Sequence, residues 1–334
     1  MKRLRVGVIG LGVGEEHIAA YQAHAACELV AVCDVSPEKR AAAREKYPSV
    51  AVVTEAKDIL KHPEIDLVSI ASYDDAHYEQ TMVAVQSGKH VFVEKPLCRS
   101  LDELRSIKRC WVDGERLYLA SNLVLRAAPL YRWLRSEIAK GALGQVYAFD
   151  GEYLYGRIEK ITEGWRKDVT DYSVIQGGGV HLVDLMLRFL GERPASVSAV
   201  GNRICTAGTD FRYHDYVAAT YLFPSSAVGR IAANFGCVHR HQHVVRLFGT
   251  KATFLSDDMG PRLHVSRDPA APPVMLDLAS VPATKGALIP SFVDAIQGGR
   301  DTRAETQHQF DVISGCVAAD QALATGRAVE IVYV

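Results

Sequence analysis

LRVGVIGLGVG, residues 4–14, is the stretch that decides the fold of this chain. A short β-branched run ends at Ile9, and a cluster of glycines then opens into a segment with the pattern of a helix. Glycines in such a turn let the backbone approach a pyrophosphate, and the helix N-terminus supplies N–H donors and the positive end of its dipole. Gly14 comes one residue earlier than the third glycine of G-x-G-x-x-G, so a tight strand–helix turn without a ligand is the alternative.

A carboxylate at the end of the next strand favours the first of these two interpretations. Asp34 follows the apolar run 29–33, at the separation from the glycines where an acidic side chain binds the adenosine ribose hydroxyls. Because a carboxylate there repels a 2′-phosphate, we expect the cofactor to be NAD, with NADP as the alternative. Lys39 and Arg40 lie nearby, but their place inside the following helix predicts that they face solvent. The predicted dinucleotide site includes Gly10, Leu11, Gly12, Val13, Gly14 and Asp34.

The first 120 residues alternate short apolar runs with helical stretches, of which 36–47 and 75–87 are amphipathic. Near-continuously apolar strands that alternate with helices indicate the α/β class, here an N-terminal Rossmann domain with a doubly wound parallel sheet covered on both faces. Ligands bind at the carboxyl ends of such strands, which adds Ala71 and Ser72 to the predicted cofactor site. The expected strands cover residues 5–9, 29–33, 50–53, 67–70, 90–93 and 117–120.

The pattern changes after residue 121, where long alternating segments replace the strand–helix repeats. Such alternation predicts a C-terminal α+β domain with a large, mostly antiparallel open sheet that is covered on one face. We therefore divide the chain into residues 1–120, a dinucleotide-binding domain, and residues 121–334, a domain for substrate binding and oligomerisation. The expected strands of the second domain are 145–155, 196–200, 216–223, 228–235, 244–248 and 263–265, and the expected helices are 127–140, 180–190, 287–297 and 305–324.

The composition of the chain indicates what kind of partner it binds. The 334 residues carry 38 Lys and Arg against 39 Asp and Glu, so the chain has no general field that attracts nucleic acid or an anionic membrane. The basic start is followed by glycines and by Glu15 and Glu16, which argues against a signal peptide. The 7 cysteines are scattered without a C-x-x-C pair, so we expect reduced thiols in a cytoplasmic protein. The expected partner is a small molecule.

Several motifs beyond the glycine turn point to one family. The most specific is EKP, which ends the segment GKHVFVEKP at residues 88–96, where a strand reaches the carboxyl edge of the sheet. The chain resembles the glucose–fructose oxidoreductase/inositol dehydrogenase (Gfo/Idh/MocA) family over nearly its whole length. The other supporting motifs are PEIDLVSI at 63–70, His77, GALG at 141–144, GGVHLVD at 178–184 and SFVDAI at 291–296.

The resemblance implies catalytic roles for Lys95 and His181. It places Lys95 beside the nicotinamide and the substrate hydroxyl, with Glu94 and His77 at the cofactor, and it makes His181 the catalytic histidine with Asp184 one helical turn later. Removal of a hydride from a sugar carbon must be matched by removal of the hydroxyl proton, which a Lys or His near neutrality can accept. The alternatives are a surface salt bridge between Lys95 and Glu94, and a core role for His181.

One position departs from the family pattern. The family commonly has an Asp four residues before the catalytic histidine, and this chain has Gly177 there. Either Lys95 and His181 suffice for the proton, or Asp184 or Asp171 substitutes, or the chemistry is altered. The Lys95–Pro96 bond is a second open point: a cis bond would aim the lysine at the nicotinamide, whereas a trans bond would let Pro96 simply end the strand.

The resemblance also brings scattered polar and aromatic residues together as a substrate pocket. Fork-shaped donors and an aromatic face suit a polyhydroxylated ring, with or without a carboxylate or phosphate. The segment HRHQH at 239–243 could place three imidazoles on one face of a strand, but a polar interface or substrate edge is favoured there and no metal is expected. The expected substrate-binding residues are Asn122, Arg126, Arg157, Trp165 and Arg166.

These observations predict an NAD(P)-dependent dehydrogenase or reductase that acts on CH–OH groups. The hydride would move between nicotinamide and a secondary hydroxyl of a sugar, a sugar derivative or a cyclitol. One alternative is a redox-neutral enzyme that keeps NAD bound and cleaves or epimerises a glycoside, for which Gly177 leaves room. A second alternative is a non-catalytic NADH-sensing protein, against which Lys95 argues. The resemblance further implies a homodimer or homotetramer formed through the C-terminal sheet.

Overall fold

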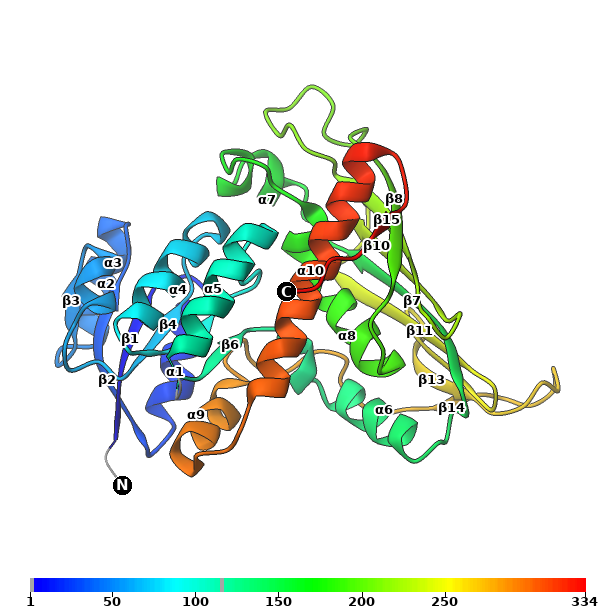
Figure 1. Ribbon diagram of the computed structural model, residues 1–334, viewed down its shortest axis with the longest axis horizontal. Coiled ribbons are helices and arrows are strands. Elements are labelled where there is room, and N and C mark those ends of the chain that lie inside the picture. The colour runs from blue at the N-terminus through cyan, green and yellow to red at the C-terminus, as the bar shows by residue number, and fades with distance from the viewer. Residues whose placement is uncertain (1–2, 115–116) are drawn as a thin grey trace. The chain divides into compact units, whose positions relative to one another are not determined.

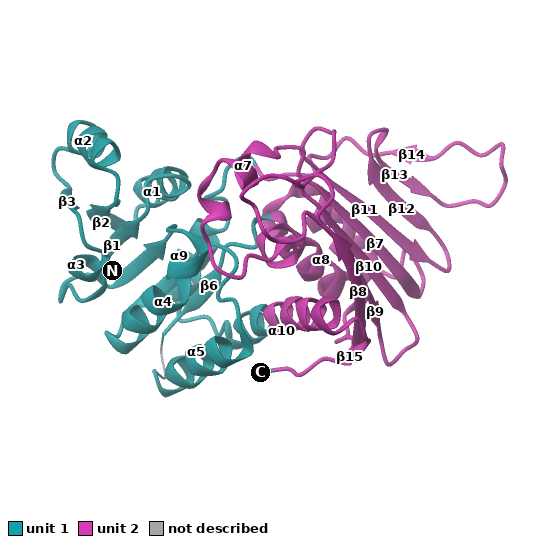
Figure 2. Cartoon of the chain, turned by 90° about the horizontal axis from the view of Figure 1, so that it is seen from above, with its two compact units in different colours: residues 1–124, 283–310, 334 teal, residues 125–282, 311–333 magenta. Residues whose placement is uncertain are grey.

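The computed structural model describes residues 3–114 and 117–334. The chain forms two compact units, which Figure 2 shows in different colours. Unit 1 contains residues 1–124, 283–310 and 334, and unit 2 contains residues 125–282 and 311–333. The sequence pattern does not indicate that the segment 283–310 returns to unit 1.

Unit 1 is built on a six-stranded sheet with the order β3-β2-β1-β4-β5-β6. All its strand pairs are parallel, as predicted (Figure 1). The order reverses between β1 and its neighbours β2 and β4, which is the point where such sheets bind ligands at their carboxyl ends. The strands are β1 (Leu4–Ile9), β2 (Cys27–Cys33), β3 (Ala51–Val53), β4 (Leu67–Ile70), β5 (His90–Val93) and β6 (Leu119–Ser121).

Helices complete unit 1. They are α1 (Gly14–Gln22), α2 (Pro37–Lys46), α3 (Ala56–Leu60), η1 (Asp74–Ala76), α4 (His77–Gln86), α5 (Leu101–Asp113) and α9 (Ile289–Gly298), joined by the first residues of α10 (Arg303–Thr325). Helix α2 begins where the Ser36 hydroxyl accepts a hydrogen bond from the backbone N–H of Lys39. This cap starts the helix almost directly after β2, so the first turn of α2 lies close to the carboxyl end of that strand.

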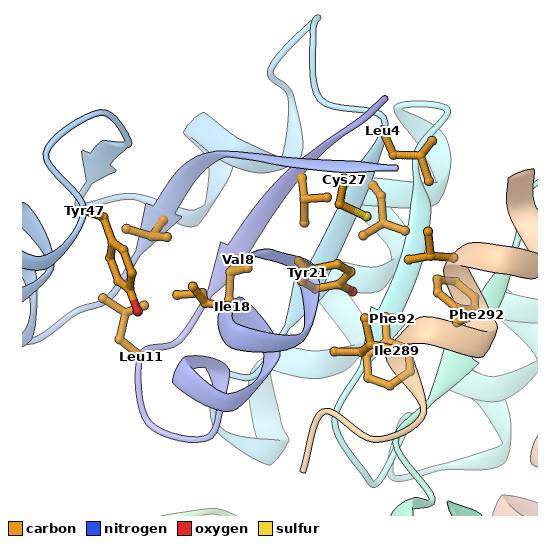
Figure 3. Close-up of a cluster of buried hydrophobic side chains, with 14 of the residues drawn as sticks. Leu4, Val8, Leu11, Ile18, Tyr21, Cys27, Tyr47, Phe92, Ile289 and Phe292 are labelled. Carbon is orange, nitrogen blue, oxygen red and sulfur yellow. The ribbon is translucent and has the colours of Figure 1, made fainter. Parts of the chain in front are cut away.

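One apolar cluster holds the glycine turn and α9 in the same core (Figure 3). Ile18 and Tyr21 of α1 are fully buried there, and the ring of Phe92 packs 5.5 Å from that of Phe292 on α9. Full burial of one such side chain contributes about 1.5–3 kcal/mol to stability. The segment 283–310 therefore returns to unit 1 because its apolar face completes this core.

Unit 2 is built on a nine-stranded sheet with the order β14-β13-β12-β11-β7-β10-β9-β8-β15. Its pairs are antiparallel except β7 with β10, which run parallel, so the sheet is mixed but mostly antiparallel, in line with the prediction. The strands are β7 (Val146–Leu154), β8 (Ser196–Asn202), β9 (Tyr216–Leu222), β10 (Val228–Asn234), β11 (Gln242–Gly249), β12 (Thr253–Asp257), β13 (Gly260–His264), β14 (Val274–Met275) and β15 (Val329–Glu330).

The helices of unit 2 cover one face of this sheet. Helix α8 (Val180–Leu190) is almost entirely buried, and the five-residue π-helical segment η4 (Ile175–Gly179) leads directly into it. The remaining part of α10 belongs to this unit, where the Tyr221 hydroxyl donates to the backbone oxygen of Gly315 at 3.3 Å. The other helices are η2 (Val124–Ala127), which begins at the last residue of unit 1, α6 (Pro129–Ala139), α7 (Glu159–Thr162) and η3 (Trp165–Lys167).

Three further features bear on the predictions. The Lys95–Pro96 bond is cis. All seven cysteines are free thiols. None of the helices in residues 3–114 and 117–334 combines the length and the apolar character that crossing a membrane requires.

Candidate functional site

The glycine turn packs its backbone against the end of β4. Gly10 has φ +90°, and its N–H donates to the Cys33 oxygen at 2.7 Å. A Cβ at this position would lie 2.2 Å from the backbone oxygen of Ala71. Both the left-handed conformation and the close approach therefore require glycine at position 10. At Gly12, by contrast, a Cβ would meet only the Lys39 Nζ atom, at 3.7 Å, so this backbone is open to a ligand.

Asp34, at the end of β2, binds the backbone of the glycine turn. Its carboxylate is buried and accepts hydrogen bonds from the N–H of Leu11, at 2.7 Å, and from the N–H of Ser36, at 2.8 Å. Lys39 Nζ lies 3.4 Å from the same carboxylate, and Arg40 donates to the backbone oxygen of Asp34 at 2.7 Å. The expectation that both side chains face solvent holds for Lys39, which is 45% exposed although the early start of α2 brings its ammonium to Asp34, and only in part for Arg40, which is half-buried at the strand end.

A buried polar network underlies the EKP segment. The Glu94 carboxylate accepts a 2.6 Å hydrogen bond from the Asn122 amide and lies 3.2 Å from His17 Nε2. His17 Nδ1 lies 2.9 Å from the Ser69 hydroxyl, so the imidazole connects β4 with the residue that follows β5. The backbone N–H of Lys95 donates to the second Glu94 oxygen at 3.3 Å. Glu94 therefore fixes the backbone from which the Lys95 side chain extends.

The charge of Glu94 is stabilised by its partners. Burial by itself would raise the pKa of this carboxyl, but the hydrogen bond and charge of His17, the charge of Lys95 and the Asn122 hydrogen bond outweigh it and lower the pKa to about 2. Glu94 is thus ionised at neutral pH while it is only 9% exposed. The carboxylate is a structural brace that also keeps a negative charge next to Lys95.

His77 connects two strand ends at the same edge of the sheet. It is fully buried at the start of α4, with Nδ1 2.7 Å from the Pro96 oxygen and Nε2 3.2 Å from the Ser72 oxygen. Ser72 in turn donates its hydroxyl to Gln80 at 2.8 Å. His77 therefore orders the backbone on which Ala71, Ser72 and Lys95 lie.

The arrangement in unit 1 fits a dinucleotide. It offers an open glycine backbone, the N-terminus of α1, and a carboxylate at the neighbouring strand end. An orphaned acceptor is also present: the Asn122 side-chain oxygen is buried and lacks a hydrogen-bond partner among the residues that the structure describes. A bound group that donates a hydrogen bond would satisfy it.

Unit 2 contributes a cluster of aromatic and imidazole rings, which we call the aromatic cluster: Tyr153, Tyr155, Phe235, His241 and His243. The two tyrosine rings lie 5.8 Å apart and nearly parallel, and Phe235 packs 4.6 Å from Tyr155. Both imidazoles meet the Tyr153 ring edge-on, at centroid distances of 5.2 and 5.1 Å. His181 of α8 lies 5.9 Å from His243, so the predicted catalytic histidine borders this cluster.

Two of the predicted substrate-binding residues contact the aromatic cluster, and a third packs against one of them. The Arg157 guanidinium lies 4.6 Å from the centre of the Tyr155 ring, and the Arg166 guanidinium lies 6.0 Å from it. Arg166 also lies 4.5 Å from the centre of the Trp165 ring. Aromatic faces beside planar donors can bind the apolar face and the hydroxyls of a sugar ring.

Two other predicted residues bind each other. Asp184 is fully buried in α8, and its carboxylate accepts hydrogen bonds from Arg126 Nε at 2.9 Å and Nη2 at 2.6 Å. This two-pronged ion pair neutralises the buried carboxylate and anchors α8 to the start of unit 2. The proposed role of Asp184 in proton transfer and that of Arg126 in substrate binding both stay predictions.

The three histidines at 239, 241 and 243 do not converge. Strand β11 begins only at Gln242, so the alternation needed to align them is lost. His239 lies 3.1 Å from the Asp258 carboxylate, while His241 and His243 face Tyr153. In the described part of the chain, no group of three His, Cys, Asp or Glu side chains is placed to hold a metal ion.

Sequence reasoning missed three buried residues around these sites. His17 is fully buried in α1, but it directly follows Glu15 and Glu16, so its polar surroundings in the sequence do not mark it as buried. Tyr172 lies only three residues before η4, but the sequence does not show that its hydroxyl returns to Gly177. Asp320 acts on η4 from α10, far along the chain. Asp320 of α10 accepts hydrogen bonds from Ser173 at 2.7 Å and from Gln176 at 2.8 Å, and burial raises its pKa to about 6.

Comparison with known proteins identifies the family. Residues 4–120 match the model of the GFO/IDH/MocA oxidoreductase family with an NAD-binding Rossmann fold. Residues 131–255 match the model of the GFO/IDH/MocA C-terminal domain. The chain therefore belongs to the Gfo/Idh/MocA family of oxidoreductases, which confirms the resemblance seen in the sequence.

Individual relatives align with this chain over different lengths. D-glucoside 3-dehydrogenase of Escherichia coli (strain K12) is 26% identical, with 98% of this chain and 97% of that protein aligned. Levoglucosan dehydrogenase of Pseudarthrobacter phenanthrenivorans is 27% identical over 60% of this chain and 54% of that protein. A structure of levoglucosan dehydrogenase with NADH and L-sorbose superposes with a TM-score of 0.87 at 21% identity, covering 99% of each chain. The myo-inositol 2-dehydrogenase of Lactobacillus plantarum gives 0.84 at 19% identity, covering 99% of this chain and 100% of that one.

Proposed function

We propose that this protein is an NAD(P)-dependent dehydrogenase or reductase that moves a hydride between nicotinamide and a secondary hydroxyl of a sugar, a sugar derivative or a cyclitol. The observation that carries the proposal lies in unit 1. Lys95 extends from a backbone fixed by the ionised Glu94, at the same carboxyl edge of the sheet as the glycine turn and Asp34. The relatives named as glucoside, levoglucosan and inositol dehydrogenases support the substrate class.

The cofactor would be held by the glycine turn and by the neighbouring strand ends. Asp34 favours NAD, while Lys39 beside it leaves NADP open as an alternative. When bound, the nicotinamide accepts or delivers the hydride. The proposed cofactor contacts are Gly10, Leu11, Gly12, Val13, Gly14, Asp34, Ala71, Ser72, His77, Glu94 and Lys95, with His77 and Glu94 acting by ordering the backbone.

Lys95 and His181 would handle the proton. When the carbinol becomes a carbonyl, its hydroxyl proton must go to a base, and the Lys95 Nζ atom takes it when neutral. His181, in unit 2, would hold or pass a proton. Asp184 lies in the same helix as His181, and the ion pair of Asp184 with Arg126 would hold that helix in place.

The substrate would bind at the aromatic cluster. Tyr155 and Trp165 offer ring faces, and Arg157 and Arg166 offer donors beside them. Asn122 and Arg126 complete the proposed substrate contacts. In this scheme residues 1–120 serve the cofactor, while residues 121–334 serve the substrate and assembly.

Assembly would use the open face of the nine-stranded sheet. Val200, Leu222 and Val228 are 70%, 51% and 37% exposed on this face, and Val228 lies opposite Leu222 in the register. Between these apolar side chains and β11, Arg230 pairs with Asp150 in the middle of the same face. An apolar rim around paired charges suits a second copy of the chain in a homodimer or homotetramer. A light-scattering mass near 36.6 kDa would contradict this, and Leu222→Asp should shift the mass toward that value.

We also propose a cytoplasmic location, on the state of the cysteines. All seven thiols are free, and burial raises the pKa of Cys98 and of Cys316 well above the ordinary value. Free thiols persist in a reducing compartment, where disulfides are rare. Cell fractionation with an antibody against the chain would test the location directly.

The main proposal is tested by cofactor binding followed by a substrate screen. We expect the fluorescence of NADH to saturate on titration with the protein, and reduced nicotinamide to form with NAD⁺ and a member of a panel of sugars, sugar acids and cyclitols. Lys95→Met should abolish turnover but keep NADH binding, whereas Lys57→Met, an exposed lysine of α3, should change neither. A flat titration with both NADH and NADPH would contradict the proposal.

A further inference from the structure

The helical turn before His181 has no side chain of its own at Gly177, and a tyrosine from outside fills that place. A Cβ at position 177 would lie 2.2 Å from the Tyr172 hydroxyl oxygen and 2.8 Å from the ring carbon that carries it. Real Cβ contacts essentially never fall below 3.0 Å. The Tyr172 hydroxyl therefore occupies the space into which a side chain at 177 would extend.

The tyrosine is fixed in this position. Tyr172 is 6% exposed, and its ring makes edge contacts with Phe211, at 5.9 Å, and with Phe235 of the aromatic cluster, at 6.4 Å. Arg166 Nε donates to the hydroxyl oxygen at 3.1 Å. Because the oxygen accepts from a guanidinium, the hydroxyl proton is directed to another acceptor, and the neighbouring positive charge makes it a better donor.

His181 shares the same turn. It follows Gly177 by four residues, and side chains of a helix lean toward its N-terminus, so a residue covers the turn that precedes its own Cα. In an α-helix this direction would bring the imidazole of His181 over the turn at Gly177, beside the Tyr172 hydroxyl. His181 is 7% exposed, so water competes poorly for its ring nitrogens.

We propose that Tyr172 is a positioning residue for His181: its hydroxyl, held by Arg166, donates a hydrogen bond to an imidazole nitrogen and so fixes the tautomer and ring orientation of the histidine. The neutral hydroxyl takes the place that Gly177 leaves open. This rests on the proposed function only for the meaning of His181 in proton transfer. The hydrogen bond itself exists or fails whatever the substrate is.

A titration of His181 by NMR tests the hydrogen bond without cofactor or substrate. The full chain is labelled at the histidine Cε1 carbons, and the His181 signal is identified by its loss in His181→Gln. A hydrogen bond donated to the nitrogen stabilises the neutral imidazole, so Tyr172→Phe should raise the titration midpoint of His181 by about 0.4–1 unit. Tyr213→Phe is the matched control, because that hydroxyl accepts from the Asp171 N–H at 2.9 Å and should leave the midpoint unchanged.

A second variant keeps the test decisive if Tyr172→Phe does not fold. Tyr172→Leu also removes the hydroxyl, so it should raise the midpoint in the same direction as Tyr172→Phe, because the donor to the imidazole nitrogen is lost. A midpoint within 0.1 unit of the wild type in the folded variant, or an equal shift in Tyr213→Phe, overturns the proposal. NADH affinity should stay unchanged in all these variants, so its loss would count against the dinucleotide site rather than against Tyr172.

Discussion

Replacing Glu94 with glutamine removes the charge at the centre of the network formed by His17, Asn122 and the backbone of Lys95. The folded protein lowers the pKa of this carboxyl from 4.5 to about 2, so the carboxylate stabilises the fold above pH 4.5, and this stability is lost as the pH falls through 2. Applied between pH 7 and pH 3, that shift corresponds to about 2 kcal/mol of unfolding free energy. Glu94→Gln has no such proton to take up and should lack this part of the pH dependence.

The assay is urea unfolding at pH 7 and pH 3, followed by the fluorescence of Trp111, the tryptophan of unit 1. Trp133→Phe and Trp165→Phe form the background in which only Trp111 reports. Glu28→Gln is the matched control, because Glu28 is 44% exposed, lies 3.6 Å from Arg5, and should contribute less than about 1 kcal/mol at either pH. If Glu94→Gln and the background lose the same stability on acidification, the reasoning about the network is wrong.

Three further predictions concern other residues of the two units. Burial raises the Asp320 pKa from 3.8 to about 6. The free energy of unfolding should therefore fall by about 2 kcal/mol as the pH rises from 4 to 7. Urea titrations of Asp320→Asn should lack this decrease. Gly10→Ala would force a Cβ to 2.2 Å from the Ala71 oxygen at φ +90°, and we expect about 1–3 kcal/mol of destabilisation and at least tenfold weaker NADH binding by fluorescence titration. Arg126→Met leaves Asp184 buried without its partner and should cost about 3–5 kcal/mol; a loss below 1 kcal/mol would show that the pair is not a buried brace.

The parallel sheet of unit 1 could be predicted because its strands are short apolar runs separated by helices. The glycine turn and Asp34 needed only local sequence, since both lie at strand ends that follow from the alternation. Strands β14 and β15 were missed because two residues each are too few to show alternation, and the five-residue strand β12 was not predicted either. The parallel pairing of β7 with β10 was also invisible, because strand direction depends on the path of the chain between them.

The sequence predicted those parts of the site that lie within one short segment of the chain. EKP and the segment around His181 are contiguous motifs, whereas the partners that hold them come from elsewhere in the chain. His17 reaches Glu94 from a distant helix, and Asp320 reaches Ser173 and Gln176 from α10. Tyr172 is near Gly177 in the sequence, but only the fold brings its hydroxyl into the space at that glycine. Hydrophobic periodicity does not encode such contacts, so they appear only in the structure.

The central claim is that Lys95 takes the proton while a hydride passes to nicotinamide. The most direct measurement follows the absorbance of reduced nicotinamide after NAD⁺ is mixed with levoglucosan, methyl β-D-glucopyranoside or myo-inositol, for the wild type and for Lys95→Met. We predict net formation of reduced nicotinamide by the wild type with at least one of these compounds, and a loss of at least about a hundredfold in Lys95→Met at unchanged NADH affinity. Turnover of a sugar seen by NMR without any net reduced nicotinamide would contradict the claim and establish redox-neutral chemistry instead.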